Sequence, residues 1–201
     1  MISRIKIVRL LTKKSDEDLL DGRFEIGRKI YNLCLLEIKR RYDSMRKSPE
    51  YAALLEMPRG KKRSAAVKKL LKASDLEEYA IYRYIVMASD SYEGLMDPCT
   101  AQKIASFAWN ACERALARRS FSIKLLYENE FNAIESMSND SGIMYSDGFI
   151  LWNGLKIACL HENQWQDDAV EFNVEYCGMQ RNVISGKRVY HAFLVLKDSM
   201  A

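Results

Sequence analysis

The sequence lacks any apolar run long enough to cross a bilayer. A membrane-spanning helix needs about 20 consecutive apolar residues, whereas the longest runs here, such as 33–36 and 84–88, are short. The N-terminal stretch MISRIKIVRLLTKK alternates basic and apolar side chains and has no continuous apolar segment of the kind that secretory signals contain. These absences exclude a membrane-spanning protein and predict a protein of the cytoplasm.

Metal-site and disulfide patterns are lacking as well. The five cysteines are an odd number and form no C-x-x-C pair, so the spacing that zinc sites and disulfide frameworks use is missing. They are Cys34, Cys99, Cys112, Cys159 and Cys177. We expect no metal and no cofactor, and we expect reduced cysteines that pack as small hydrophobes. His161 and His191 stand in no recognisable nucleophile motif, so no catalytic residue is assigned.

What the sequence does have is an uneven distribution of charge. The whole chain carries a net charge of +4. Residues 1–72 contain 20 basic and 9 acidic side chains, which gives +11, and residues 73–201 contain 11 basic and 18 acidic side chains, which gives −7. A segment this basic favours an anionic partner, either a phosphate backbone or an acidic membrane surface.

The first residue patterns predict a strand and then a long helix. Residues 2–11 are rich in β-branched side chains and alternate in part, which predicts a strand with basic residues on one side. Apolar residues at three- and four-residue spacing then predict a helix that starts at an N-cap at Ser15 and ends near residue 48. Gly22 and Gly27 within this helix indicate a break or a close backbone approach.

Two more helices are expected before the pattern changes to strands. One covers 75–92, and the other begins at Asp97 and carries an apolar stripe typical of a packed helix. Short runs separated by glycines follow: an Asp-Gly turn within 141–151 predicts a hairpin, and 169–180 with 189–196 predicts a second one. Because an isolated first strand must find a sheet, we expect it to pair with this C-terminal β segment, with the helices inserted between them.

A dense basic cluster lies between the predicted helices. Pro58 and Gly60 mark a loop, and the cluster leads from it into a further helix. Its members are Arg59, Lys61, Lys62 and Arg63. Positive charge at the start of a helix opposes the helix dipole, so helix stability does not explain the cluster. Binding of an anionic partner explains it better, and a solvated run of charge is the alternative.

Several segments, taken in order, resemble one family. RIKIVRLLTKKSDEDLLDGRFEIGRKIYNLCL resembles the N-terminus of the TnpB-like transposon-encoded proteins, the RNA-guided nucleases from which type V CRISPR effectors descend, and its Arg28, Tyr31 and Asn32 match an Arg-x-x-Tyr/Phe-Asn element. DPCTAQKIASFAWNACERAL resembles a later helix of that family, with matching Pro98 and Gln102 but a Cys-Thr pair in place of the usual Ser. NDSGIMYSDGFILWNGLKIACL and VEYCGMQRNVISGKRVYHAFLVL resemble its β segment. No segment is specific alone, and the succession over nearly the whole chain carries the resemblance.

The resemblance implies an α+β fold in two parts. Residues 1–14 and 126–201 would form the wedge domain, a small oligonucleotide-binding-like β-barrel, and residues 15–125 a helical-bundle recognition domain inserted after its first strand. The segments of the family's RuvC nuclease domain and its four-cysteine zinc element are not in this sequence. RuvC catalysis needs carboxylates that hold two metal ions. We therefore expect that this chain does not cut nucleic acid by itself.

The function that the resemblance implies is binding of a guide RNA and of double-stranded target DNA with its flanking motif. Basic side chains would contact phosphates, and amide side chains can pair with base edges. The candidate binding residues are Arg4, Lys6, Arg9, Lys13, Arg28, Tyr31, Asn32, Arg59, Lys61, Lys62, Arg63, Gln102, Lys103 and Arg114. Solvent exposure is the alternative for the basic residues, and packing or capping is the alternative for Tyr31, Asn32 and Gln102.

Three tryptophans and two other functions complete the expectations. Trp109 is expected in the core, while stacking on unpaired bases stays open for Trp152 and Trp165. A protein-interaction subunit would use the acidic β segment to dock a separate RuvC nuclease chain or a second copy of this chain. An independent enzyme would need a pocket of clustered polar residues, and the sequence supplies no motif for one.

Overall fold

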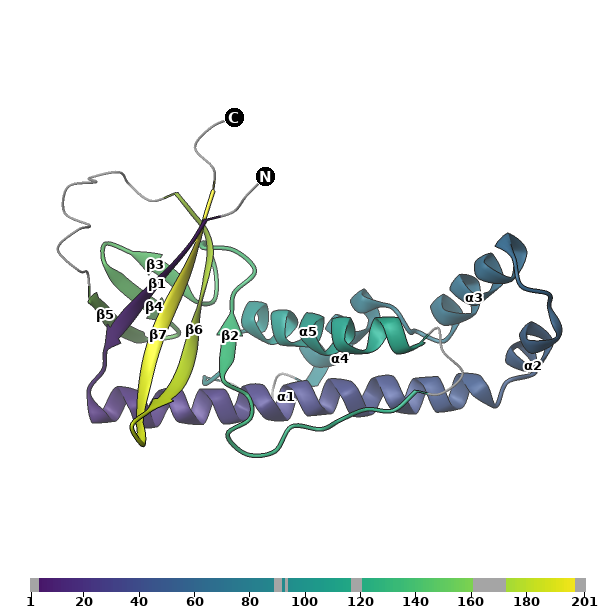
Figure 1. The fold of residues 1–201 in the computed structure, drawn as a ribbon, viewed down its shortest axis with the longest axis horizontal. Helices are drawn as coiled ribbons and strands as arrows, with labels where there is room; N and C mark the ends of the chain where they lie inside the picture. The colour runs from purple at the N-terminus through teal and green to yellow at the C-terminus, as the bar shows by residue number, and fades with distance from the viewer. Residues whose placement is uncertain (1–3, 89–91, 93, 117–120, 161–172, 198–201) are drawn as a thin grey trace.

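The fold is α+β, with a strand before the helices and the remaining strands after them. The computed structural model describes residues 4–88, 92, 94–116, 121–160 and 173–197. The first strand is β1 (Arg4–Leu11). The helices are α1 (Lys14–Arg46), α2 (Pro49–Glu56), α3 (Lys61–Ala73), α4 (Glu78–Ala88) and α5 (Pro98–Leu116). The later strands are β2 (Ala133–Glu135), β3 (Met144–Ser146), β4 (Phe149–Trp152), β5 (Leu155–Leu160), β6 (Val174–Ile184) and β7 (Lys187–Leu196). Figure 1 shows the sheet at one end of α1 and the other helices along its remaining length.

The strands form one antiparallel sheet in the order β2-β6-β7-β1-β5-β4-β3. β1 lies between β7 and β5, with Ile7 paired to Phe193, so the prediction that the first strand joins the C-terminal β segment is confirmed. The Asp-Gly hairpin is confirmed too: Asp147 and Gly148 connect β3 to β4 with φ angles of 49° and 82°, as a type I′ turn requires. The second hairpin is β6–β7, and the part of it expected at 169–172 lies outside the described residues.

The sheet does not close into a barrel, so that part of the predicted fold is wrong. β2 and β3 stand at its two ends and are three residues long each. A side chain spans the gap instead. Asn139 Nδ2 donates to the Tyr145 carbonyl at 3.0 Å, and its Oδ1 accepts from the Tyr145 amide at 2.7 Å. The Asn139 backbone amide also donates to the Glu175 carbonyl of β6 at 3.0 Å. Asn139 thus links β3, at one end of the sheet, to β6, which is next to the strand at the other end.

The start of α1 differs slightly from the prediction. Lys13, and not Ser15, is the N-cap residue, and the helix begins at Lys14. Asp16 accepts a hydrogen bond from the Lys13 amide at 2.9 Å, which satisfies one of the donors that a helix start leaves open. Acidic side chains therefore occupy the first turn as expected, but two positions further from the cap than a cap at Ser15 would place them.

α1 continues without a break through both of its glycines. A Cβ at Gly27 would lie 2.6 Å from Cε1 of Phe131, whereas a Cβ at Gly22 would meet nothing within 4 Å. The close approach that the sequence offered as one alternative is therefore confirmed at Gly27. It lets the chain leading to β2 pack directly on the backbone of α1.

One hydrophobic core runs from the inner face of the sheet into the helices. Phe24 of α1 packs beside Tyr190 of β7, with ring centroids 6.4 Å apart. Further along α1, Ile30 and Ile38 are fully buried with Ile104 of α5. The apolar stripe of α5 is thus the packed face that its sequence predicts.

Arg23 ties the helices to the sheet. It is 2% exposed, donates to the carbonyls of Trp152 and Asn153 at 2.7 and 2.8 Å, and lies 4.5 Å from the centroid of the Trp152 ring. Trp152 Nε1 in turn donates to Asp97, which precedes α5, at 2.8 Å. Burial lowers the pKa of Arg23. Trp152 is therefore a core residue, Trp109 is buried as expected, and Trp165 lies outside the described residues.

The cysteines are free thiols, and most of them are buried. Cys34, Cys112, Cys159 and Cys177 are buried and Cys99 is half-buried, which confirms the prediction that they pack as hydrophobes. Within the described part of the chain, no group of side chains has the composition of a metal site. No helix in that part is both long enough and apolar enough to cross a membrane.

Candidate nucleic-acid interface

α3 is a basic helix with no buried residue. At 100° per residue, one face of it presents five lysines, and the opposite face presents apolar side chains that are half-buried. The lysines, all exposed, are Lys61, Lys62, Lys68, Lys69 and Lys72, and they are called the lysine face below. No acidic residue occurs between 57 and 74. The lysine face is therefore a patch of one sign over the roughly 20 Å length of the helix.

The start of α3 is weakly stabilised by its own sequence. Gly60 is the N-cap and supplies no side-chain hydrogen bond, and the first turn contains no acidic residue. Three basic residues lie there instead, of which Arg63 donates to the Met57 carbonyl at 3.1 Å. Positive charge at this position opposes the helix dipole, so the stability of the helix does not account for these residues.

α3 lies at the far end of the molecule from the sheet. Figure 1 shows α2 and α3 as a hairpin beyond the end of α1. Ser48 caps α2 by accepting from the Tyr51 amide at 3.2 Å, so the turn out of α1 is well defined. The hairpin leaves the lysine face open to solvent along its whole length.

A groove of about 870 Å³ separates α3 from α5. Arg59, Arg63 and Lys68 line it on the α3 side, and Trp109 and Glu113 line it on the α5 side. The cations of the predicted cluster therefore divide between two places. Lys61 and Lys62 belong to the lysine face, whereas Arg59 and Arg63 border the groove.

The Arg-x-x-Tyr-Asn element is engaged within the chain. Asn32 uses both ends of its amide on Leu126: its Nδ2 donates to the Leu126 carbonyl at 2.8 Å, and its Oδ1 accepts from the Leu126 amide at 2.9 Å. Arg28 donates to the same carbonyl at 2.8 Å and is paired with Glu25. Tyr31 packs on a phenylalanine ring 6.0 Å away. The element fastens the segment after α5 to α1, which is the packing alternative.

Lys103 and the remaining α5 residues lie near the junction with the sheet. Lys103 forms an ion pair with Glu135 of β2 at 3.0 Å and lies 5.2 Å from the centroid of the Tyr176 ring. Gln102 is half-buried on the same helix. The side chain of Arg114 lies outside the described residues. The predicted binding residues are therefore spread over the molecule, and no single surface collects them.

The basic residues of the first strand do not form a separate basic face. Arg4 and Arg9 are exposed and Lys6 is half-buried on β1, and Lys13 is exposed beyond its end. Arg4 and Lys6 share the parity of buried Val8, and the opposite face carries isoleucines as well as Arg9. The expectation of a strand with its basic residues on one side is therefore wrong. The physical reason is that the core takes the even positions and leaves the cations divided.

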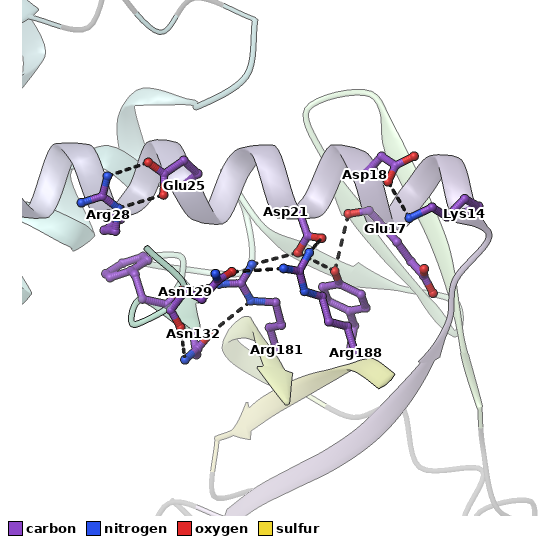
Figure 2. Close-up of polar contacts among 12 residues, drawn as sticks. Lys14, Glu17, Asp18, Asp21, Glu25, Arg28, Asn129, Asn132, Arg181 and Arg188 are labelled. Carbon is purple, nitrogen blue, oxygen red and sulfur yellow. Dashed lines mark hydrogen bonds and ion pairs between the residues drawn. The ribbon is translucent and has the colours of Figure 1, made fainter. Parts of the chain in front are cut away.

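Two basic residues that the prediction omitted, Arg181 and Arg188, are held in a network with Asp21 of α1 (Figure 2). Arg181 donates to Asp21 at 2.8 Å and to Asn132 at 3.1 Å, and Tyr190 donates to Asp21 at 2.7 Å. Burial alone would raise the pKa of Asp21, but the hydrogen bonds from Arg181, Tyr190 and Arg188 outweigh it and hold the pKa below its ordinary value. These cations stabilise the fold and add little to an external field.

Comparison with known proteins gives no family assignment, since neither the family models nor the curated proteins contain a match to this chain.

Proposed function

We propose that the chain binds nucleic acid and that the lysine face of α3 is its main contact with phosphates. The observation that carries this proposal is a helix with five exposed lysines, no acidic residue within the helix and no buried residue. Lysine side chains contact phosphates as point charges and carry no sequence information. An acidic membrane surface would be attracted by the same field, so the experiment includes it as a competing outcome.

The dependence of affinity on salt gives the size of the expected effect. Each phosphate neutralised on a duplex contributes about −0.9 to the slope of log affinity against log salt concentration, so five lysines give a slope of about −4.5. Affinity should then fall about 500-fold between 50 and 200 mM salt. With three of the five lysines removed, the slope should be about −1.8 and the fall about 12-fold.

The experiment is a titration of a fluorescent 20-base-pair duplex by anisotropy over that salt range. The test variant is Lys61→Ala/Lys68→Ala/Lys72→Ala. The matched control is Lys124→Ala/Lys187→Ala/Lys197→Ala, which removes three exposed lysines elsewhere. We expect a reduced slope for the test variant and the original slope for the control. Equal slopes for both variants, no binding at 50 mM salt, or tighter binding to anionic vesicles than to the duplex would contradict the proposal.

We propose further that the sheet is the wedge domain and that α1–α5 form the recognition domain of a TnpB-like protein, with a guide RNA and double-stranded target DNA as partners. The order of the elements supports this, because a single strand precedes the helices and then lies in the middle of the sheet that the later strands complete. The proposal concerns binding only and assigns no cleavage step to the described residues. Sequencing of RNA that copurifies from native cells tests it: one enriched structured RNA is expected, and a mixture that mirrors total RNA contradicts it.

A further inference from the structure

The sheet has an exposed apolar face on the side away from its core. Ile5 and Ile7 of β1 are each 62% exposed, Leu11 is 51% exposed, and Leu160 of β5 is 44% exposed. These four residues are called the sheet patch below. On the opposite, inward face of β1, Val8 and Leu10 are each 3% exposed. β1 is therefore apolar on both faces, whereas a strand with one solvated face normally alternates apolar and polar side chains.

The sheet patch runs along β1 and reaches β5, whereas Val195 of β7, opposite Ile5, is only 3% exposed. β1 lies between β7 and β5, and the register places Arg9 opposite Leu160 on one side and His191 on the other. Ile7 is opposite Phe193, which is half-buried. Figure 1 shows β1 and β7 side by side with the helices below and to one side of them. Several adjacent exposed aliphatic residues are the mark of an interaction surface, unlike scattered single ones.

The charge of this face restricts what can cover it. β1, β5 and β7 contain no aspartate or glutamate, and Glu17 of α1, which lines the hollow beside Arg9 and Leu160, already accepts a hydrogen bond from the Thr12 hydroxyl at 3.0 Å. Arg9 is exposed within the patch, and Lys156 of β5 is exposed at its margin, where its ammonium lies 4.2 Å from the centroid of the Phe149 ring. A complementary surface therefore combines apolar side chains with carboxylates, because an unpaired Arg9 would be desolvated on contact.

The side chains favour a polypeptide over nucleic acid or a second copy. Nucleic-acid sheets bind bases by stacking on exposed rings, but the exposed side chains here are aliphatic. The nearest ring, that of Phe193, lies over Gly178, where a Cβ would be 2.3 Å from its Cζ. In a contact between two copies of this face, the cations Arg9 and Lys156 of each copy would meet strands that carry no carboxylate.

We infer that the outer face of β7-β1-β5 docks an acidic, apolar polypeptide segment, with Ile5, Ile7, Leu11 and Leu160 as the apolar contact and Arg9 as the partner of a carboxylate. This surface is separate from the lysine face of α3, which lies at the other end of the molecule (Figure 1). The inference is independent of nucleic-acid binding. A chain can fail one test and pass the other.

The test is a display selection of random peptides against the full chain, with counter-selection against Ile5→Glu/Ile7→Glu. Peptides that combine apolar residues with Asp or Glu are expected. Synthetic copies of them should bind the double variant at least about tenfold more weakly than the unaltered chain, because the new carboxylates would be buried against apolar and acidic groups. Val183→Glu/Ile184→Glu is the matched control, since it places two glutamates on exposed β-branched positions of β6 outside the patch, and it should leave the affinity unchanged.

A charge reversal separates specific docking from general stickiness. Arg9→Glu should weaken the selected acidic peptides about tenfold, and the same peptides with lysine in place of their acidic residue should recover affinity for that variant. Circular dichroism checks that the variants fold, which is expected at exposed positions. Four outcomes would overturn the inference: selection of no acidic apolar peptide, equal binding to the double variant and the control, a dimer that Ile5→Glu/Ile7→Glu makes monomeric, or loss of duplex binding in that variant with no loss of peptide binding.

Discussion

Asp21 gives a sharp test of how α1 is attached to the sheet. Its carboxylate accepts from Arg181 at 2.8 Å and from the Tyr190 hydroxyl at 2.7 Å, and it is ion-paired with Arg188. The side chain of Arg181 is only 7% exposed, so its charge depends on this partner more than on water. Asp21→Asn keeps the size of the side chain and removes its charge.

The magnitude follows from the exposure of the groups. Removal of one partner from a buried ion pair destabilises a protein by about 3–5 kcal/mol. Asparagine keeps one acceptor oxygen and Asp21 is 20% exposed, so we expect a loss of about 2–3 kcal/mol in the free energy of unfolding. The matched control is Asp18→Asn. Asp18 is 64% exposed and pairs with Lys14 in the same helix, and its loss should change stability by less than about 0.5 kcal/mol.

The pH dependence has a definite sign. The pKa of Asp21 is lower in the folded chain than its ordinary value of 3.8. A lowered pKa means that the group's stabilisation is complete above the unfolded pKa and is lost as the pH falls through the folded one. The difference in stability between the unaltered chain and Asp21→Asn should therefore be constant from about pH 7 to 5 and should shrink below about pH 4.

Urea unfolding followed by circular dichroism at pH 7 and at several values down to pH 3 measures both effects. The slope of free energy against urea should be the same in all three proteins, so that the midpoints report stability directly. A loss of less than about 0.5 kcal/mol in Asp21→Asn, or a loss equal to that of Asp18→Asn, would show that the network adds nothing beyond an exposed pair. A difference that grows toward low pH would refute the assigned sign.

Gly27→Ala should lower the free energy of unfolding by about 1–3 kcal/mol, because its Cβ would lie 2.6 Å from a ring carbon. Gly22→Ala, in the same helix with nothing within 4 Å, should raise the free energy of unfolding by about 0.5–1 kcal/mol. If urea unfolding shows that both variants change stability in the same direction, the close packing at Gly27 is contradicted. Asn32→Ala should lower the free energy of unfolding by about 1–2 kcal/mol, because two hydrogen bonds are lost. Its affinity for the duplex should stay within about threefold of the unaltered chain's, and a larger drop in anisotropy titrations would show that Asn32 contacts nucleic acid. In thiol labelling at pH 8, half-buried Cys99 should react in the folded chain, while Cys177, whose pKa burial raises to about 12, should react only after unfolding. If the folded unaltered chain is labelled quickly at two sites and Cys177→Ser at only one, Cys177 is reactive in the folded chain and the prediction is wrong.

Local signals made much of the fold predictable. Asp147 and Gly148 take the left-handed backbone angles that an Asp-Gly turn indicates, and the hairpin follows from those two residues and the short runs beside them. The isolated first strand had to find a sheet, and the later strands were the ones available. These inferences needed only neighbours in the sequence and the rule that buried backbone groups are paired.

The parts that failed depend on contacts between distant residues. The two ends of the sheet are linked through Asn139, whose side chain bonds to β3 while its backbone bonds to β6, and no local pattern in the sequence shows that an asparagine will take the place of a strand pair. The same holds for Asn32, whose partner Leu126 is 94 positions away. The sequence also did not show which side of β1 faces the core. Its apolar and basic residues alternate only in part, and packing against the core, not charge, determines which set of alternate residues points inward.

The net charge of +11 on residues 1–72 changes its meaning once the contacts are known. Arg23 is buried against a tryptophan, Arg28 fastens a loop, and Arg41 bonds Glu37 and the Asp75 carbonyl. Such cations hold the fold together and already use their hydrogen-bond donors within the chain. The lysine face of α3 is different, because its side chains share one exposed surface on a helix that contains no acidic residue. Salt dependence should therefore follow these five lysines and not the total charge, so a variant that removes three of them should lose most of the slope although most of the positive charge of the segment remains.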